Sequence, residues 1–149
     1  MLMLNIGILA IVAAFSSSSL AIKRASRMST AAALADKQME RYRALTYSAI
    51  TLDSASVTSA NGLPSYASDS AWSSSQVTTT CTTPVPFECA ASQNLTGADS
   101  GTYRVDTYIT YQTPPSGRQG KLVTIVVRDT GNGSRALVRV SSTFDQATG

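Results

Sequence analysis

Two cysteines are the residues best placed to form a covalent link within this chain. Cys81 and Cys89 bracket the segment TTPVPFE, a spacing far from the C-x-x-C of redox motifs. A bond between them would close a nine-residue loop and stabilise the fold by about 2–3 kcal/mol in the chain-entropy model. Two buried free thiols are the alternative. We expect the disulfide, which implies an oxidising compartment outside the cytoplasm.

Motifs for catalysis or metal binding are scarce. The sequence has no histidine, which excludes His-based triads and His-ligated zinc sites. The segment SGRQGKLV superficially resembles a phosphate-binding loop, but Pro115 stands where a Gly is required and Leu122 replaces the Ser or Thr that holds magnesium. Carboxylate pairs are the remaining catalytic option. The sequence therefore predicts a protein that is not an enzyme and has no cofactor or metal ion.

The first 22 residues carry no charged side chain. As an α-helix they would span about 33 Å, which matches the hydrocarbon core of a bilayer. The apolar run is too long for a signal peptide and no Lys or Arg precedes it. Small serines at Ser16–Ser19 can bond to their own backbone in lipid and let helices approach, although they lower the helix propensity. The segment predicts either a simple membrane anchor or a helix that later packs against copies of itself.

Positive charge is concentrated in the N-terminal third of the chain. Residues 1–50 carry six Lys/Arg and two Asp/Glu, whereas residues 51–149 carry six and seven. Lys23, Arg24 and Arg27 directly follow the apolar run, where the positive-inside rule alone would leave the domain in the cytoplasm. A removed basic leader could reverse that orientation. No basic patch with interleaved aromatic residues is present, so we expect no nucleic-acid binding.

A helical pattern continues to about residue 50, because residues 22–50 contain no Gly or Pro and are rich in good helix formers. The sequence predicts one helix over residues 1–50, about 75 Å long, apolar all round in its first half and amphipathic in its second. A domain of about 100 residues cannot bury the first half, but the second half can dock on a small sheet. Apolar residues recur there at three- and four-residue steps: Met28, Ala32, Ala35, Met39, Tyr42, Leu45 and Ala49.

Residues 51–100 form a Ser/Thr-rich connecting region that includes the Cys81–Cys89 loop. Residues 46–100 contain 21 Ser/Thr and no Lys or Arg. We expect this region to lie over the sheet rather than to be a flexible linker, because it contains apolar anchors. Its Ser/Thr side chains could carry surface glycans, and Asn94 and Asn132 match the N-glycosylation pattern. The predicted anchors are Tyr66, Trp72, Val77, Val85 and Phe87.

Residues 101–149 predict a three-stranded antiparallel sheet. The segments TYRVDTYITYQ, KLVTIVVRD and RALVRVSSTF alternate apolar and polar residues and are joined by the turn-rich segments TPPSGRQG and DTGNGS. One face of this sheet would pack on the helical stripe, and the other would meet the connecting region or solvent. The predicted fold class is α+β, with a long N-terminal helix packed on a small antiparallel sheet.

This arrangement resembles that of mature type IV pilins and type II secretion pseudopilins. The segment LADKQMERYRALTY is similar to the second half of the long helix of minor pilins and pseudopilins, and the resemblance covers about the first 50 residues. The family's short basic leader ending in Gly is not present, as we expect if numbering starts at the processed N-terminus, and Asn5 stands where the family has Glu. The resemblance implies a pilin-like fold and processing, with methylation, at Met1.

A pilin-like function would be structural. The resemblance implies a subunit of an extracellular filament, or fimbrium, for adhesion, motility or surface attachment, inserted in the cytoplasmic membrane before assembly. Its partners would be copies of itself in a helical homo-oligomer, with Met1 and Asn5 as assembly contacts. The alternatives are a pseudopilin of a type II secretion system and a single-pass anchored periplasmic binding domain that does not polymerise. The predicted filament-core residues are Leu2, Leu4, Ile8, Leu9, Ile11, Val12 and Phe15.

Overall fold

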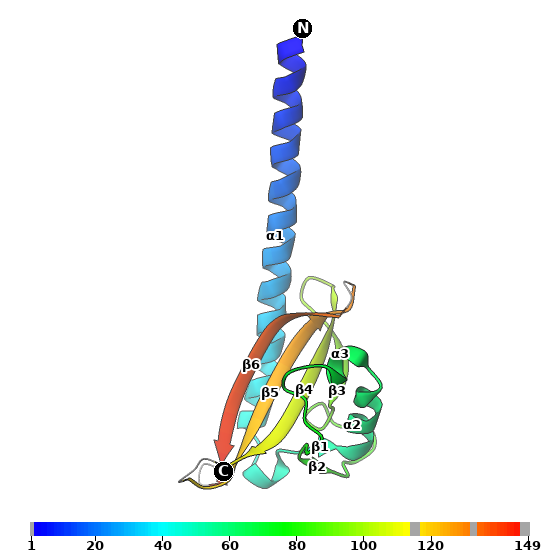
Figure 1. Ribbon diagram of the computed structural model, residues 1–149, viewed down its shortest axis with the longest axis vertical. Helices are drawn as coiled ribbons and strands as arrows, with labels where there is room; N and C mark the ends of the chain where they lie inside the picture. Colours follow the sequence, from blue (N-terminus) through cyan, green and yellow to red (C-terminus); the bar gives the residue numbers. More distant parts are fainter. Residues whose placement is uncertain (1, 114–116, 132–133, 147–149) are drawn as a thin grey trace.

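One long helix lies against an antiparallel sheet in an α+β fold (Figure 1). The computed structural model describes residues 2–113, 117–131 and 134–146, with side chains from residue 20 onward. The elements in chain order are α1 (Leu2–Arg43), the 3₁₀ turn η1 (Tyr47–Ala49), β1 (Leu52–Asp53), α2 (Ser54–Asn61), α3 (Pro64–Ala67), β2 (Thr78–Thr79), β3 (Ser92–Thr96), β4 (Thr102–Gln112), β5 (Gly120–Asp129) and β6 (Arg135–Asp145).

The main sheet has four strands in the order β3-β4-β5-β6, with antiparallel neighbours throughout. The sequence predicted three strands within 101–149, and β3 is the additional one, inside the predicted connecting region. Its sequence SQNLT is short and polar, so apolar alternation does not reveal it. Backbone pairing with β4 makes it a strand, from Ser92 opposite Asp106 to Thr96 opposite Thr102.

The second half of α1 packs on the sheet through one buried stripe. Ala35, Met39 and Tyr42 are at most 1% exposed, as the periodicity predicted, and Ala31 joins them. They share one apolar core with Val105, Ile109, Val123 and Ile125. Two predicted members fall outside the stripe: Met28 is 53% exposed because it precedes the part of α1 in the core, and Ala49 is exposed because it lies after the end of the helix.

The helix ends at Arg43, earlier than the predicted residue 50. The chain turns there and buries Ile50 in the core, and Lys121 Nζ, from the start of β5, donates to the carbonyls of Tyr47 (2.7 Å) and Ile50 (2.9 Å). Burial of Ile50 and capping of these carbonyls outweigh the helix propensity of the segment. Through Ser16–Ser19, by contrast, α1 is unbroken α-helix.

The first half of α1 extends beyond the sheet (Figure 1). Residues 20–29 are all exposed, including the large apolar side chains of Leu20 and Ile22. Within the part of the chain that the structure describes, there is no helix both long and apolar enough to cross a membrane.

The connecting region covers the sheet face opposite α1. Tyr66 of α3 donates from its hydroxyl to the carbonyl of Thr107 (2.9 Å), and the hydroxyl of Tyr108 donates to the carbonyl of Tyr66 (3.1 Å). Their rings stack with centroids 4.4 Å apart. Of the predicted anchors, Tyr66 and Val77 are buried, whereas Trp72, Val85 and Phe87 are 39%, 40% and 53% exposed. Those three side chains are therefore surface features and not core anchors.

Candidate functional site

Of the two predicted assembly contacts, only Asn5 lies within the described residues, on the projecting part of α1. Met1 is outside the described residues, and Asn5 belongs to the first turns of the helix. The side-chain contacts of Asn5 are outside what the structure describes, so only its position on a continuous helix is established. The predicted filament-core residues share that position: Leu2, Leu4, Ile8, Leu9, Ile11, Val12 and Phe15.

The place where α1 leaves the sheet, which we call the neck, is fixed by an ion pair. Arg27 Nη1 lies 2.6 Å from Oδ2 of Asp129, the last residue of β5. Arg27 is 53% exposed and Asp129 only 10% exposed, so solvent screens the pair from one side. Beside it is a cavity of about 940 Å³ between residues 20–28 of α1 and the rim of the sheet. The neck therefore combines an ion pair with an adjacent open cavity.

The β3–β4 turn closes the other side of the neck. The amide of Gly97 donates to the carbonyl of Gly101 (2.8 Å), and the Tyr103 hydroxyl donates to Asp99 Oδ2. The Tyr103 hydrogen bond lowers the pKa of Asp99, and burial followed by the Asp99 contact raises the pKa of Tyr103 to about 12. A Cβ at Gly97 would lie 2.4 Å from Thr30 Cγ2 on α1, so glycine permits this close approach of turn and helix.

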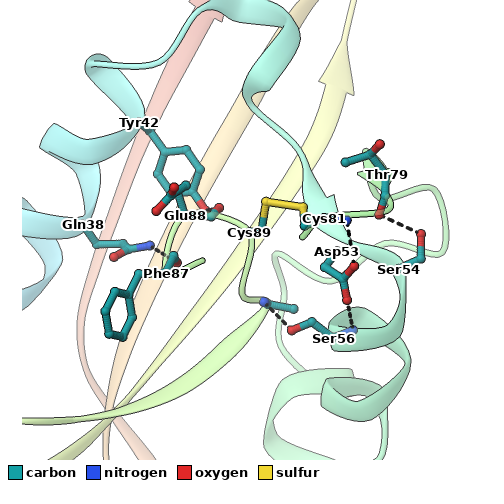
Figure 2. The surroundings of a disulfide bond; sticks show 11 residues. Gln38, Tyr42, Asp53, Ser54, Ser56, Thr79, Cys81, Phe87, Glu88 and Cys89 are labelled. Carbon is teal, nitrogen blue, oxygen red and sulfur yellow. Dashed lines mark hydrogen bonds between the residues drawn. A yellow bond between two sulfur atoms is a disulfide. The ribbon is translucent and has the colours of Figure 1, made fainter. Parts of the chain in front are cut away.

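Cys81 and Cys89 form the expected disulfide, with Cα atoms 6.6 Å apart (Figure 2). The loop they close docks on α1 through its backbone. Gln38 Nε2 donates to the carbonyl of Phe87 (2.9 Å), and the Tyr42 hydroxyl donates to the carbonyl of Glu88 (2.6 Å). Burial raises the pKa of Tyr42 and keeps this donor protonated at neutral pH. The loop is thus held at a fixed height on the helix.

Asp53 contacts both cysteines on the other side of the loop, and Figure 2 shows its side-chain hydrogen bonds with Cys81 and Ser56. Its Oδ1 accepts from the amide of Cys81 (3.1 Å), its Oδ2 accepts from the amide of Ser56 (2.8 Å), and its own amide donates to the carbonyl of Cys89 (2.8 Å). The amides of Cys81 and Ser56 lower the pKa of Asp53. Asp53 therefore caps α2 and anchors the disulfide loop at once.

A buried ionic cluster lies between the sheet and the connecting region. Asp106, with no exposed side-chain surface, accepts from Arg104 Nε (3.0 Å) and Arg128 Nε (2.8 Å). Asp69, which follows α3, contacts Arg128 and accepts from Arg139 Nη2 (2.7 Å). Burial alone would raise the pKa of Asp69, but the Ala71 amide and the two arginines outweigh it and lower that pKa. The Asp69 carboxylate is thus held ionised.

This ionic cluster links the main sheet to the connecting region that covers it. Each carboxylate is saturated by arginine donors, so neither is available as a general acid or base. Among the described residues, no group of three or more His, Cys, Asp or Glu side chains is placed to hold a metal ion.

Comparisons with known proteins reveal no relative of this chain. No protein-family model, no curated protein and no solved structure matches this chain. The α+β architecture is therefore established by the structure itself, and the likeness to pilins remains a resemblance in sequence and arrangement.

Three contacts of the described sites were not predicted from the sequence. Arg27 was interpreted only as a cation flanking a membrane segment, yet it pairs with Asp129. The loop contacts of Gln38 and the pairing of Asp69 with Arg128 also link residues far apart in the chain. The one local signal was the opposite charge of Arg104 and Asp106, two residues apart on one face of a strand, a spacing that suits an ion pair but does not reveal burial.

Proposed function

We propose that this chain is a structural subunit of an extracellular, type IV pilus-like filament. One observation carries the proposal: the N-terminal half of α1 extends beyond the sheet, away from the domain that would otherwise cover it (Figure 1). Residues 20–29 are exposed although Leu20, Ile22 and Met28 are among them. A helix with this composition needs a partner outside its own domain.

Copies of the same helix are the partner that the sequence favours. Burying a Leu, Ile or Phe side chain gains about 1.5–3 kcal/mol, and the segment 2–15 is rich in such residues. Small residues of the same helix, including Gly7 and Ser16–Ser19, allow close helix contacts. Repetition of one contact that does not close on itself gives a helical filament. Insertion in the cytoplasmic membrane before assembly, and processing at Met1, stay predictions from the sequence.

The sheet, its covering layer and the disulfide loop would then form the outer surface of the filament. A disulfide suits a small domain that works outside the cell, because it stabilises a core of limited size and persists in an oxidising compartment. The exposed Ser/Thr side chains of the connecting region would face the medium and set adhesion.

Electron microscopy of sheared cell-surface material, labelled with antibodies against this chain, tests the proposal. We expect labelled filaments for the natural chain and for a Lys37→Gln control, which changes an exposed residue of α1. Leu9→Glu should abolish the filaments, because it places a charge in the filament core where copies of α1 would pack. A chain found only in membrane fractions would favour the anchored binding domain. Short assemblies that depend on a secretion system would favour the pseudopilin. Either result would overturn the proposal of a pilus subunit.

A further inference from the structure

The cavity at the neck has an unusual lining for a small domain. Four cationic side chains and two carboxylates line it, which gives a net charge of +2. Exposed apolar side chains are interspersed with the cations on α1, where Leu20 is 57% exposed, Ile22 70% and Met28 53%. An exposed apolar patch of this kind, rimmed by charge, marks an interaction site.

Both carboxylates of the cavity are already engaged by the protein. Asp129 accepts from Arg27 and from the amide of Gly131 (2.9 Å). Asp99 accepts from the Tyr103 hydroxyl and from the amide of Gly101 (3.1 Å).

The remaining cations are unneutralised. Within the described part of the chain, Lys23, Arg24 and Arg135 make no ion pair. Lys23 and Arg24 come from α1, and Arg135 comes from the rim of the sheet at the start of β6. The cavity therefore presents positive charge from two sides.

We propose that this cavity binds the phosphate headgroup of an anionic phospholipid, with the first part of the acyl chains against Leu20, Ile22 and Met28. Arginine and lysine are the side chains that recognise phosphate, and their apolar stems can lie along acyl chains. The cavity begins at the C-terminal end of the uncharged segment 1–22, at Leu20 and Ile22, so it lies at headgroup level if that segment is in a membrane. The assignment of a lipid rests on the membrane stage of the proposed function.

Lipid binding at the neck would give the subunit a defined height and tilt before assembly. The headgroup would bridge α1 and the rim of the sheet, alongside the Arg27–Asp129 pair. Leaving the membrane would then exchange a headgroup for water or for another copy of the chain.

Titration of lipids into the full chain in a neutral detergent, followed by native mass spectrometry, measures this directly. The probes are phosphatidylglycerol and phosphatidylcholine, and the variants are Lys23→Gln/Arg24→Gln and Arg135→Gln. The matched controls are Lys37→Gln/Arg118→Gln and Arg118→Gln, which remove the same charge from exposed positions outside the cavity. Circular dichroism checks that every variant is folded.

We expect tighter binding of phosphatidylglycerol than of phosphatidylcholine, and a loss of about fivefold for each cavity charge removed, with little change in the controls. The Arg135→Gln variant is decisive, because a merely basic helix flank would not need a residue from the sheet. Equal affinity for both lipids, an unaffected Arg135→Gln variant or an equal loss in the controls would overturn the proposal.

Two other occupants have separate readouts. Displacement of the lipid by free glycerol phosphate at similar concentration would indicate a soluble anion and overturn the lipid assignment. Cavity variants that lose lipid-free self-association, measured by analytical ultracentrifugation, would assign the cavity to a contact between copies and likewise overturn it. Filament formation is scored independently by electron microscopy, so the filament proposal can fail while lipid selectivity stands, and the reverse.

Discussion

Arg128 on β5 places its Nε 2.8 Å from Oδ2 of Asp106 on β4, and its Nη2 contacts Asp69 beyond α3. One buried guanidinium thus joins two neighbouring strands to the segment that covers them. The side chains of Asp106 and Asp69 are 0% and 4% exposed, so water screens these contacts little.

Replacement of Asp106 by Leu should be severely destabilising. It leaves the guanidinium groups of Arg104 and Arg128 buried without their shared acceptor. We expect a loss of about 3–5 kcal/mol in the free energy of unfolding, measured by urea titration. The Arg139→Gln control removes the half-exposed member of the cluster and should cost less than about 1 kcal/mol. Equal losses in the two variants would contradict the importance of burial.

Removal of the disulfide should weaken the fold without releasing the loop from α1. The Cys81→Ser/Cys89→Ser variant should lose about 2–3 kcal/mol, as expected for a loop of this length. The carbonyls of Phe87 and Glu88 would still accept from Gln38 and Tyr42. Urea titration gives the stability, and hydrogen exchange at the loop amides reports docking. Full loss of protection in the loop would show that the disulfide, and not α1, holds it.

Replacement of Gly97 by Ala should loosen the neck. The new Cβ would lie 2.4 Å from Thr30 Cγ2 and 2.7 Å from Tyr103 Cε2, so turn and helix must separate. We expect a loss of about 1–3 kcal/mol and faster hydrogen exchange near Thr30. The Gly131→Ala control meets its nearest atom, Asp129 Oδ1, at 3.4 Å and should change stability by less than about 0.5 kcal/mol. Similar effects at both glycines would refute the steric account.

Stability should fall in alkaline solution between about pH 10 and pH 12. Burial raises the pKa of Tyr42, Tyr66 and Tyr108, and raises that of Tyr103 to about 12. The unfolded chain therefore loses these protons first, and each tyrosine lowers the free energy of unfolding by up to about 1.4 kcal/mol per pH unit in that window. Burial lowers the pKa of Lys121, so this single group acts in the opposite direction, but only at the lower end of the pH range.

Urea titrations at several pH values between 9 and 12 measure this slope. The Tyr103→Phe variant should show a smaller decline, because one group with a raised pKa is removed. A stability independent of pH across this range would contradict the protonated, buried state of the tyrosines.

Periodicity predicted the packing of α1 because that interaction depends on apolar spacing alone. Ala35, Met39 and Tyr42 lie where a 3.6-residue repeat puts them. The end of the helix was not predictable in this way, since it depends on Lys121, a residue far along the chain that binds the carbonyls of Tyr47 and Ile50.

The packing on the sheet face opposite α1 was harder to predict from the sequence. Arg104 and Asp106 have the composition of a solvent-facing row, and their burial is tolerated only because Asp106 pairs with both Arg104 and Arg128. Strand β3 was missed for a related reason, because main-chain pairing defines it and its side chains are polar. Side chains of residues 2–19 are outside the described part of the chain, so the predicted assembly contacts stay predictions.

The attachment of α1 to its domain has a mechanical consequence. The helix is held at its far end by the Tyr42 and Gln38 contacts, along its length by the stripe in the core, and at the neck by Arg27. A pull on the N-terminus along the helix axis would load these contacts in shear, so that many resist together. A sideways pull would instead peel the helix from the sheet, starting at Arg27 and breaking one contact after another. The same subunit should therefore be strong under axial tension and compliant to bending at the neck.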